Sequence, residues 1–144
     1  MNRRSVVPEE YQAVAARFGF SPAVRVGNLI ICSGQVGEGA PDDLERQMVS
    51  AWTRVGEVLR AAGAGFGDVV EVVSYHVGLR QQLDTFVNVK ARFLPGPVLP
   101  AWTAVGVTEL SPPGRAVEIK VTAVVPDRPT DATATRKPLG TTKE

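Results

Sequence analysis

The sequence has few of the side chains that build disulfides, metal centres or aromatic platforms: its 144 residues include one cysteine, one histidine and 6% aromatic residues. Cys32 has no partner within the chain, so a disulfide framework is excluded and a reducing compartment is expected. His76 has no other ligand at metal-binding spacing, so we expect it to be structural. The sequence predicts no bound metal, and we expect no cofactor.

An excess of charge of one sign and long apolar runs are also lacking. The chain has 16 basic and 15 acidic side chains and no stripe of basic and aromatic residues, so nucleic acid is not an expected partner. No apolar run approaches the roughly 18 residues that a membrane-spanning helix needs, and residues 1–10 contain no apolar signal segment. We expect a cytoplasmic protein with no nucleic-acid and no membrane partner.

The length favours a single domain with one hydrophobic core. We divide the chain into an N-terminal segment (1–19), a domain (20–125) and a C-terminal stretch (126–144). The last is mostly Pro, Thr, Asp, Arg and Lys and has little to bury, so we expect a flexible tail.

Apolar residues at helical spacing predict three helices. The clearest spans 42–62, with Asp42 as its N-cap candidate and Gly63 just past its end. A shorter helix covers 9–18, and a third ends before Pro95. The apolar stripe of the third helix consists of Leu83, Phe86, Val87, Lys90, Phe93 and Leu94.

Alternating or β-branched stretches predict the strands. Residues 23–35 should form a hairpin with its turn at 27–28, and residues 69–77 should form a central strand covered on both faces. The stretches 101–108 and 116–125 are separated by a proline-rich turn, so we expect them to pair antiparallel.

This order of elements predicts an α+β fold, in which a mixed sheet of four to six strands carries two helices on one face. The other face would then expose a larger apolar patch than a monomer normally tolerates. We therefore expect the chain to form an oligomer through that face.

Six short strings occur in the order and at the spacing that are typical of one family. On these strings the chain resembles the RidA family, also called YjgF, YER057c, UK114 or L-PSP, over about residues 20–125. The resemblance implies a chorismate-mutase-like fold, a homotrimer with three clefts at the subunit boundaries, and hydrolysis of enamines and imines to ketones and ammonia. The strings are Phe20-Ser21-Pro22-Ala23-Val24, Gly27-Asn28-Leu29 leading to Ser33-Gly34-Gln35, Gly67-Asp68-Val69-Val70, Phe86-Val87-Asn88, Pro100-Ala101 with Val105-Gly106-Val107, and Val117-Glu118-Ile119.

Glu118 is the candidate catalytic residue. From periodicity alone it is a polar residue on a strand face, either solvated or at a subunit contact. The resemblance implies instead that its carboxylate orients a water molecule for attack on the imine carbon, which is general acid/base work. Ser33 and Gly34 could simply end a strand, and the resemblance places them in the lining of the cleft.

Two further residues are candidates for substrate binding. Asn88 suits the polar face of a helix, but the resemblance matches it to a position that holds the site together in relatives. Phe20 falls where relatives often have tyrosine, and its ring could pack on a ligand but cannot donate a phenolic hydrogen bond.

The chain departs from the family pattern at Trp102, where the best-known relatives have an arginine that grips the substrate carboxylate with paired hydrogen bonds. An indole has one N–H donor and no charge. The next such position, commonly cysteine or threonine, is Ala104. Arg25 and Arg115 are candidates to replace the missing cation, but nothing in the sequence places either in the cleft.

Two functions therefore compete, both with a small molecule as ligand. Glu118 favours an imine or enamine deaminase whose substrate lacks the usual amino-acid carboxylate. Trp102 and Ala104 favour a non-catalytic trimer that binds or senses a small molecule. Ribonuclease activity, which has been attached to some family members, is disfavoured by the near-neutral charge.

Overall fold

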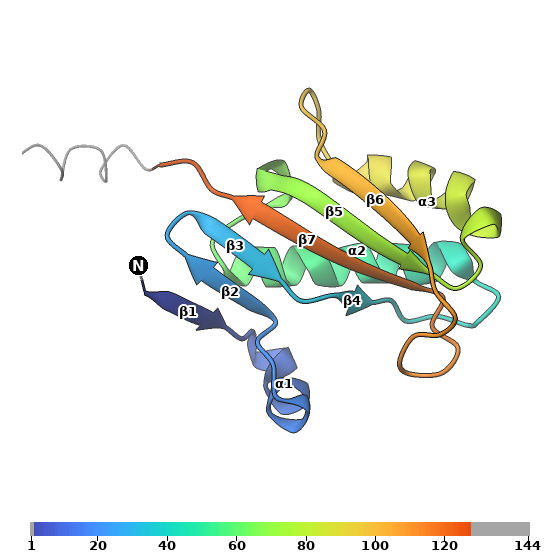
Figure 1. Cartoon of the computed structure of the whole chain (residues 1–144), viewed down its shortest axis with the longest axis horizontal. Helices are drawn as coiled ribbons and strands as arrows, with labels where there is room; N and C mark the ends of the chain where they lie inside the picture. The colour runs from blue at the N-terminus through green and yellow to red at the C-terminus, as the bar shows by residue number, and fades with distance from the viewer. Residues whose placement is uncertain (1, 128–144) are drawn as a thin grey trace, which may run out of the picture.

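The computed structural model describes residues 2–127 as a seven-stranded mixed sheet with two long helices on one face (Figure 1). The sequence-based α+β class is therefore confirmed. Most of the predicted C-terminal tail lies outside the described residues. No helix in the described range is both long and apolar enough to cross a membrane.

The elements begin close to where the sequence patterns place them. In chain order they are β1 (Arg3–Val6), η1 (Glu9–Tyr11), α1 (Gln12–Phe18), β2 (Ala23–Val26), β3 (Leu29–Cys32), β4 (Gln35–Val36), α2 (Leu44–Ala61), η2 (Phe66–Asp68), β5 (Val69–His76), α3 (Leu79–Phe93), β6 (Ala101–Gly106) and β7 (Val117–Val124).

The strand order is β1-β2-β3-β7-β5-β6, with β4 also on β7. The predicted antiparallel pairing of the last two strands is wrong: β6 pairs in parallel with β5, and β7 lies between β3 and β5. The physical reason is the helix α3 between β5 and β6, because a helical crossover returns the chain in the same direction. The sheet also exceeds the expected six strands, because β1 and the two-residue β4 have no clear apolar pattern.

The predicted helix over 42–62 is confirmed as α2, which buries Trp52 and Val55 against the sheet and α3. Its N-cap is Asp43 rather than Asp42, since the Asp43 carboxylate accepts a hydrogen bond of 3.1 Å from the Arg46 N–H. Around Trp52 the ring of Phe86 is stacked at 6.2 Å between centroids. This aromatic cluster is the centre of the core.

The predicted apolar stripe of α3 is partly wrong. Leu83 and Val87 are 40% and 41% exposed, whereas Gln82 and Val89 are buried. A polar residue can occupy the buried position because the Gln82 side-chain amide donates to the Val77 and Ala116 carbonyl oxygens at 2.8 and 3.0 Å. The periodicity of hydrophobic residues does not show that a buried glutamine has hydrogen-bond partners for its side chain.

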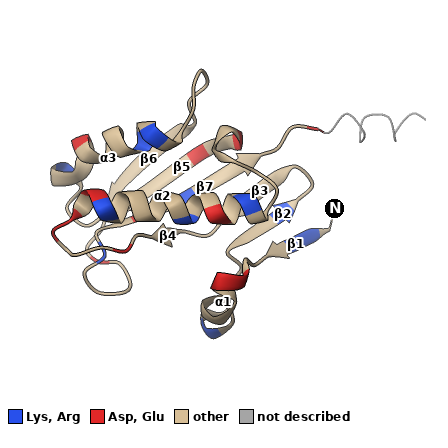
Figure 2. Cartoon of the chain, turned by 180° about the vertical axis from the view of Figure 1, so that it is seen from behind, with Lys and Arg blue, Asp and Glu red and all other residues tan. Residues whose placement is uncertain are grey.

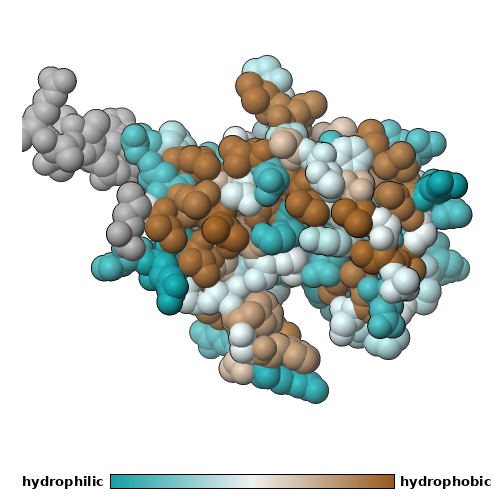
Figure 3. All heavy atoms as spheres, in the orientation of Figure 1, coloured by the Kyte–Doolittle hydropathy of each residue, from teal (hydrophilic) through white to brown (hydrophobic). Residues whose placement is uncertain are grey.

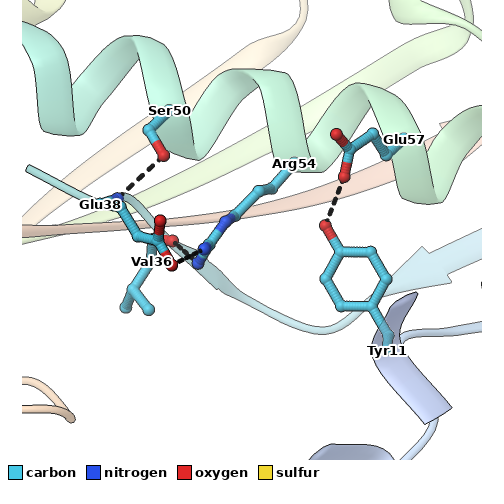
Figure 4. Close-up of polar contacts among 6 residues, drawn as sticks. All are labelled: Tyr11, Val36, Glu38, Ser50, Arg54 and Glu57. Atoms are coloured by element: carbon cyan, nitrogen blue, oxygen red, sulfur yellow. Dashed lines mark hydrogen bonds and ion pairs between the residues drawn. The ribbon is translucent and has the colours of Figure 1, made fainter.

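Residues 3–18 are attached to the main body rather than separate from it, because β1 extends the sheet beside β2. Figure 4 shows that the Tyr11 hydroxyl donates to the Glu57 carboxylate of α2, at 2.7 Å. On the same helix Arg54 donates to the Val36 carbonyl oxygen at 2.8 Å and pairs with Glu38. These contacts hold the η1 segment and β4 against the middle and C-terminal part of α2.

The face of the sheet turned away from α2 and α3 has no helix over it in the described chain. We call this the open face; it carries Leu29, Ile31, Tyr75, Glu118, Lys120, Thr122 and Val124. Figure 3 shows apolar residues gathered in patches over it, and Figure 2 shows charged residues of both signs along α2 on the other side. Leu29, Ile31 and Val124 are 38%, 43% and 44% exposed, so a single copy presents apolar side chains to solvent on this face.

The fully buried side chain of Gln47 ties α2 to the loop that leads into β7. Its amide donates to the carbonyl oxygens of Ala40 and Gly114, at 3.0 and 3.2 Å, and its oxygen accepts from the Ala116 N–H at 2.8 Å. One side chain therefore satisfies three backbone groups.

We expect Gln47→Ala to lower the free energy of unfolding by about 2–4 kcal/mol, because it removes a buried side chain and leaves backbone groups unpaired. Urea denaturation at fixed protein concentration measures this. Gln81→Ala, an exposed position on α3, is the matched control and should change stability by less than about 0.5 kcal/mol. Equal effects of the two substitutions would contradict the assigned role of Gln47.

Candidate functional site

Glu118 lies near the start of β7 with its side chain on the open face, and its cross-strand partners are Tyr75 and Val36. Its carboxyl group lies against Gly34: a Cβ at that position would be 2.3 Å from Oε1 of Glu118. Any other residue at Gly34 would therefore displace the carboxyl group. The structure thus brings together two of the predicted site residues.

The Glu118 carboxyl group has the electrostatics of a proton-transfer group. It is half-buried, and burial raises its pKa above the ordinary value. Within residues 2–127 it accepts no hydrogen bond and forms no ion pair, and the nearby Lys120 ammonium donates instead to the Cys32 carbonyl oxygen at 3.1 Å. A carboxyl group whose pKa is moved toward neutrality, with free oxygens, suits general acid/base catalysis.

Ser33 connects the Gly34 segment to the loop before β2. Its hydroxyl donates to the Ser21 carbonyl oxygen at 2.7 Å, and its N–H donates to the Pro22 carbonyl oxygen at 2.9 Å. Phe20 directly precedes this loop and is 40% exposed. Gly34 therefore lies beside the Glu118 carboxyl group and Ser33 beside the Ser21–Pro22 segment, whereas Phe20 lines a hollow together with Gln12 and Ala16 of α1.

Trp102 lies on the opposite face of the sheet, because it pairs with Val72, which points toward the helices. Its indole N–H donates to the Ser74 hydroxyl at 2.9 Å, and its ring is stacked on Phe86 with 5.7 Å between centroids. The Lys90 ammonium of α3 lies 4.8 Å from the indole centroid, within the range of a cation–π contact. The indole is fixed by contacts from a strand and a helix.

Ser74 also connects Trp102 to the buried His76. The Ser74 hydroxyl lies 2.8 Å from His76 Nε2, and His76 Nδ1 lies 2.9 Å from the Gln82 side-chain oxygen. Since the Gln82 NH2 group donates to two carbonyl oxygens, its oxygen must accept, and the proton of His76 is on Nδ1. Burial lowers the pKa of His76, which agrees with this neutral form and with a structural role.

Ala104 follows Trp102 on the same side of β6 and pairs with Ser74. Asn88 is exposed on α3, two residues before Lys90, so a helix of 3.6 residues per turn directs its side chain roughly 160° away from that of Lys90. The structure therefore does not bring Asn88 to Trp102. Lys90 contacts Trp102 instead. The sequence signal that could have identified Lys90 is a lysine among the apolar residues of α3.

Neither candidate replacement arginine lies at Trp102. Arg25 donates to the Ala62 carbonyl oxygen at 2.6 Å, at the C-terminal end of α2. Arg115 lines a hollow of about 470 Å³ between the loop after β6 and the start of α2, together with Leu44 and Glu109. Within the described part of the chain, no group of three or more His, Cys, Asp or Glu side chains could hold a metal ion.

Comparisons with known proteins show which family the chain is similar to. The sequence profile of the family described as Endoribonuclease L-PSP matches residues 10–125. The chain is 36% identical over 132 residues to the RutC family protein YjgH of Escherichia coli, which covers 89% of this chain and 99% of that protein. It is 33% identical over 114 residues to a protein of Dermatophagoides farinae named 2-iminobutanoate/2-iminopropanoate deaminase, with 74% and 85% of the two chains covered.

A solved structure supports the same assignment. Rv2704 of Mycobacterium tuberculosis, described as a member of the YjgF/YER057c/UK114 family, has a TM-score of 0.76, at 32% identity, over 86% of this chain and 100% of that one. The fold, the profile match over most of the chain and the identity to these relatives lead to one assignment, and the chain belongs to the L-PSP family, also called the YjgF or RidA family.

Proposed function

We propose that the chain hydrolyses the carbon–nitrogen double bond of an imine or enamine, in clefts between the subunits of a homotrimer, with Glu118 as the general acid/base. The observation that carries this proposal is the Glu118 carboxyl group, which is half-buried beside Gly34, has a raised pKa and accepts no hydrogen bond within residues 2–127. The similarity to a protein named as an imine deaminase supports the reaction class.

The arrangement of the two faces supports a cleft made by two copies. Glu118 lies on the open face and Trp102 on the helix side, so one copy does not present both to the same ligand. The open face also carries exposed apolar residues. A second copy that covers this face would bury them and would complete a cleft with residues of both faces.

The reaction needs one group that first accepts and then donates a proton. The substrate reacts as the iminium, protonated on nitrogen, and the Glu118 carboxylate takes a proton from water as the water oxygen bonds to the imine carbon, which gives a neutral carbinolamine. The protonated Glu118 then donates that proton to the amino nitrogen. As the carbon–nitrogen bond breaks, the Glu118 carboxylate accepts the proton of the carbinolamine hydroxyl, so that ketone and ammonia leave and the ammonia takes up this last proton. Burial raises the pKa of Glu118, which makes its protonated, proton-donating form more accessible than that of an exposed glutamate.

The substrate differs from that of an arginine-bearing relative. A carboxylate that enters a partly desolvated cleft loses several kcal/mol of hydration, which a guanidinium fork can return and a single indole N–H cannot. The indole N–H of Trp102 is in addition already bonded to Ser74. We therefore propose a substrate that lacks a carboxylate on the imine carbon.

A second candidate function is a non-catalytic trimer that binds a small molecule. Two observations favour it: Trp102 occupies the arginine position, and Ala104 removes a further polar group. Both functions share the trimer and the cleft. They differ in whether Glu118 turns over a ligand.

Light scattering should report a trimer of about three times 15.4 kDa, because the apolar open face needs a cover. Ile31→Lys, which places a charge on that face, should weaken the trimer. Val14→Lys is the matched control, since Val14 on α1 is similarly exposed, at 40% against 43% for Ile31, and lies off this face. A monomeric wild type at micromolar concentration would refute the intersubunit cleft.

Glu118→Gln should lower the rate of imine hydrolysis by about a hundredfold or more, the usual contribution of a general acid/base group, and should leave the trimer intact. Glu71→Gln is the matched control: Glu71 faces the same side of the sheet and is exposed. The rate of ammonia release measures both variants.

The same assay gives a pH signature. Burial raises the pKa of Glu118, so wild-type activity should fall as pH drops through a value above the ordinary glutamate range. The Glu118→Gln variant should not show this fall of activity at low pH. Unchanged turnover in a folded Gln variant would place the chemistry elsewhere.

Trp102→Arg tests the substrate class. Wild type should hydrolyse 2-iminobutanoate and 2-iminopropanoate at near-background rates, because no guanidinium holds their α-carboxylates. The Arg variant should gain measurable activity on both if Glu118 and Gly34 form a working site. Efficient wild-type turnover would show that the substrate does carry an α-carboxylate.

A further inference from the structure

The outer strand β6 and its flanking segments form an edge of the sheet without charged residues. From Phe93 to Thr108 the sequence contains no Asp, Glu, Lys or Arg. We call this stretch the β6 edge. The apolar tip of the loop before β6 is highly exposed, with Val98 at 84% and Leu99 at 63%. Lys90 of α3 brings a positive charge to this edge.

The Lys90 ammonium has no counter-charge in the described part of the chain. The residues one helical turn away, Phe86, Val87, Phe93 and Leu94, are apolar, so no i±3 or i±4 ion pair forms. The ion pairs that the described residues make are Arg54 with Glu38 and Arg92 with Glu45, and Lys90 donates no hydrogen bond to them. The ammonium instead contacts the Trp102 ring, 4.8 Å from the ring centroid.

The cation–π contact orients the ammonium without using up its donors. An ammonium group has three N–H bonds, and a ring face engages it as a charge rather than through paired hydrogen bonds. The ring itself is held by its hydrogen bond to Ser74 and its stacking on Phe86. The partly buried Lys90 and Trp102 therefore form a pre-organised pair with free donors, which lowers the entropy lost when a ligand binds.

We infer that Lys90 and Trp102 bind the acid group of a planar ligand. Trp102 carries no charge. Lys90 on the facing helix α3 supplies the positive charge at the β6 edge instead. Lys90 provides a charge-assisted hydrogen bond to the anion, and the indole provides a flat apolar surface beside it. The binding site stands on the geometry alone, whereas its assignment as the substrate subsite rests on the proposed function.

The acid group of this ligand is separated from the carbon–nitrogen double bond. The indole, rather than a guanidinium, fills the space next to β6, and the ammonium lies 4.8 Å from the ring centroid. An anion on Lys90 is therefore displaced from where an arginine at position 102 would hold it. An acid directly on the imine carbon fits this arrangement poorly, and an acid carried on a planar spacer fits it well.

The test compares 2-naphthoate with its neutral amide, 2-naphthamide, by calorimetry and by NMR of the two indole N–H groups of the chain. Wild type should bind the acid about tenfold or more tightly than the amide, since a hydrogen bond to a charged group exceeds a neutral one. The indole resonance of Trp102, assigned with Trp102→Phe, should shift on binding, and that of Trp52 should not. Pyruvate, whose acid is next to its carbonyl carbon, should compete weakly.

Three variants separate the role of Lys90 from general effects. Lys90→Met keeps much of the aliphatic stem and should abolish the preference for the acid, whereas Lys90→Arg should retain it. Arg80→Gln removes a positive charge from the exposed start of the same helix and should leave the preference intact. Equal binding of acid and amide by wild type, or an unchanged preference in Lys90→Met, would overturn the inference.

The outcome is separable from that of the proposed function, because the binding assay requires no turnover. A lost acid preference with intact, Glu118-dependent imine hydrolysis would refute the role of Lys90 and leave the reaction standing. An intact preference without hydrolysis would keep the Lys90 subsite and favour the binding function of the cleft.

Discussion

The alternation of side chains along neighbouring strands determines what one copy of this chain is able to do. In β6 and β7 successive residues point to opposite faces, and the register places Glu118 beside Tyr75 but Trp102 beside Val72. Helices cover one face and leave the other exposed. The proposed acid/base group and the proposed ligand-binding ring are thus separated by the sheet, so the proposed function requires a second copy that covers the open face.

Polar side chains inside the core position both β7, which carries Glu118, and the indole of Trp102. Gln47 fixes the loop that enters β7, and Gln82 fixes the tautomer of His76, which in turn bonds to Ser74. Ser74 accepts the indole N–H of Trp102. The interior therefore contains a fully directed hydrogen-bond network whose last member faces the β6 edge. Such satisfied networks specify one arrangement of the side chains they contain.

The sequence predicted the elements better than their pairing. The helix α2 follows directly from its amphipathic pattern, whereas the neighbours of β6 depend on the crossover through α3, a non-local feature. The predicted apolar stripe of α3 omitted the buried Gln82, because hydrophobic periodicity depends on polarity and contains no information on satisfied hydrogen bonds. The contact of Glu118 with Gly34 agrees with the resemblance. The place of Lys90 on Trp102 depends on how a helix packs on an edge strand, which no local pattern contains.

The most direct test of a cleft shared between copies is a thiol cross-link between its two sides. Glu118→Cys and Ala104→Cys place thiols on opposite faces of the sheet, and burial raises the pKa of the native Cys32 thiol to about 11, so it should stay unreactive. With a short bifunctional thiol reagent, the double variant should give covalent dimers and trimers on a denaturing gel, and each single variant should stay monomeric. A double variant that remains monomeric after complete reaction of both thiols would contradict the shared cleft.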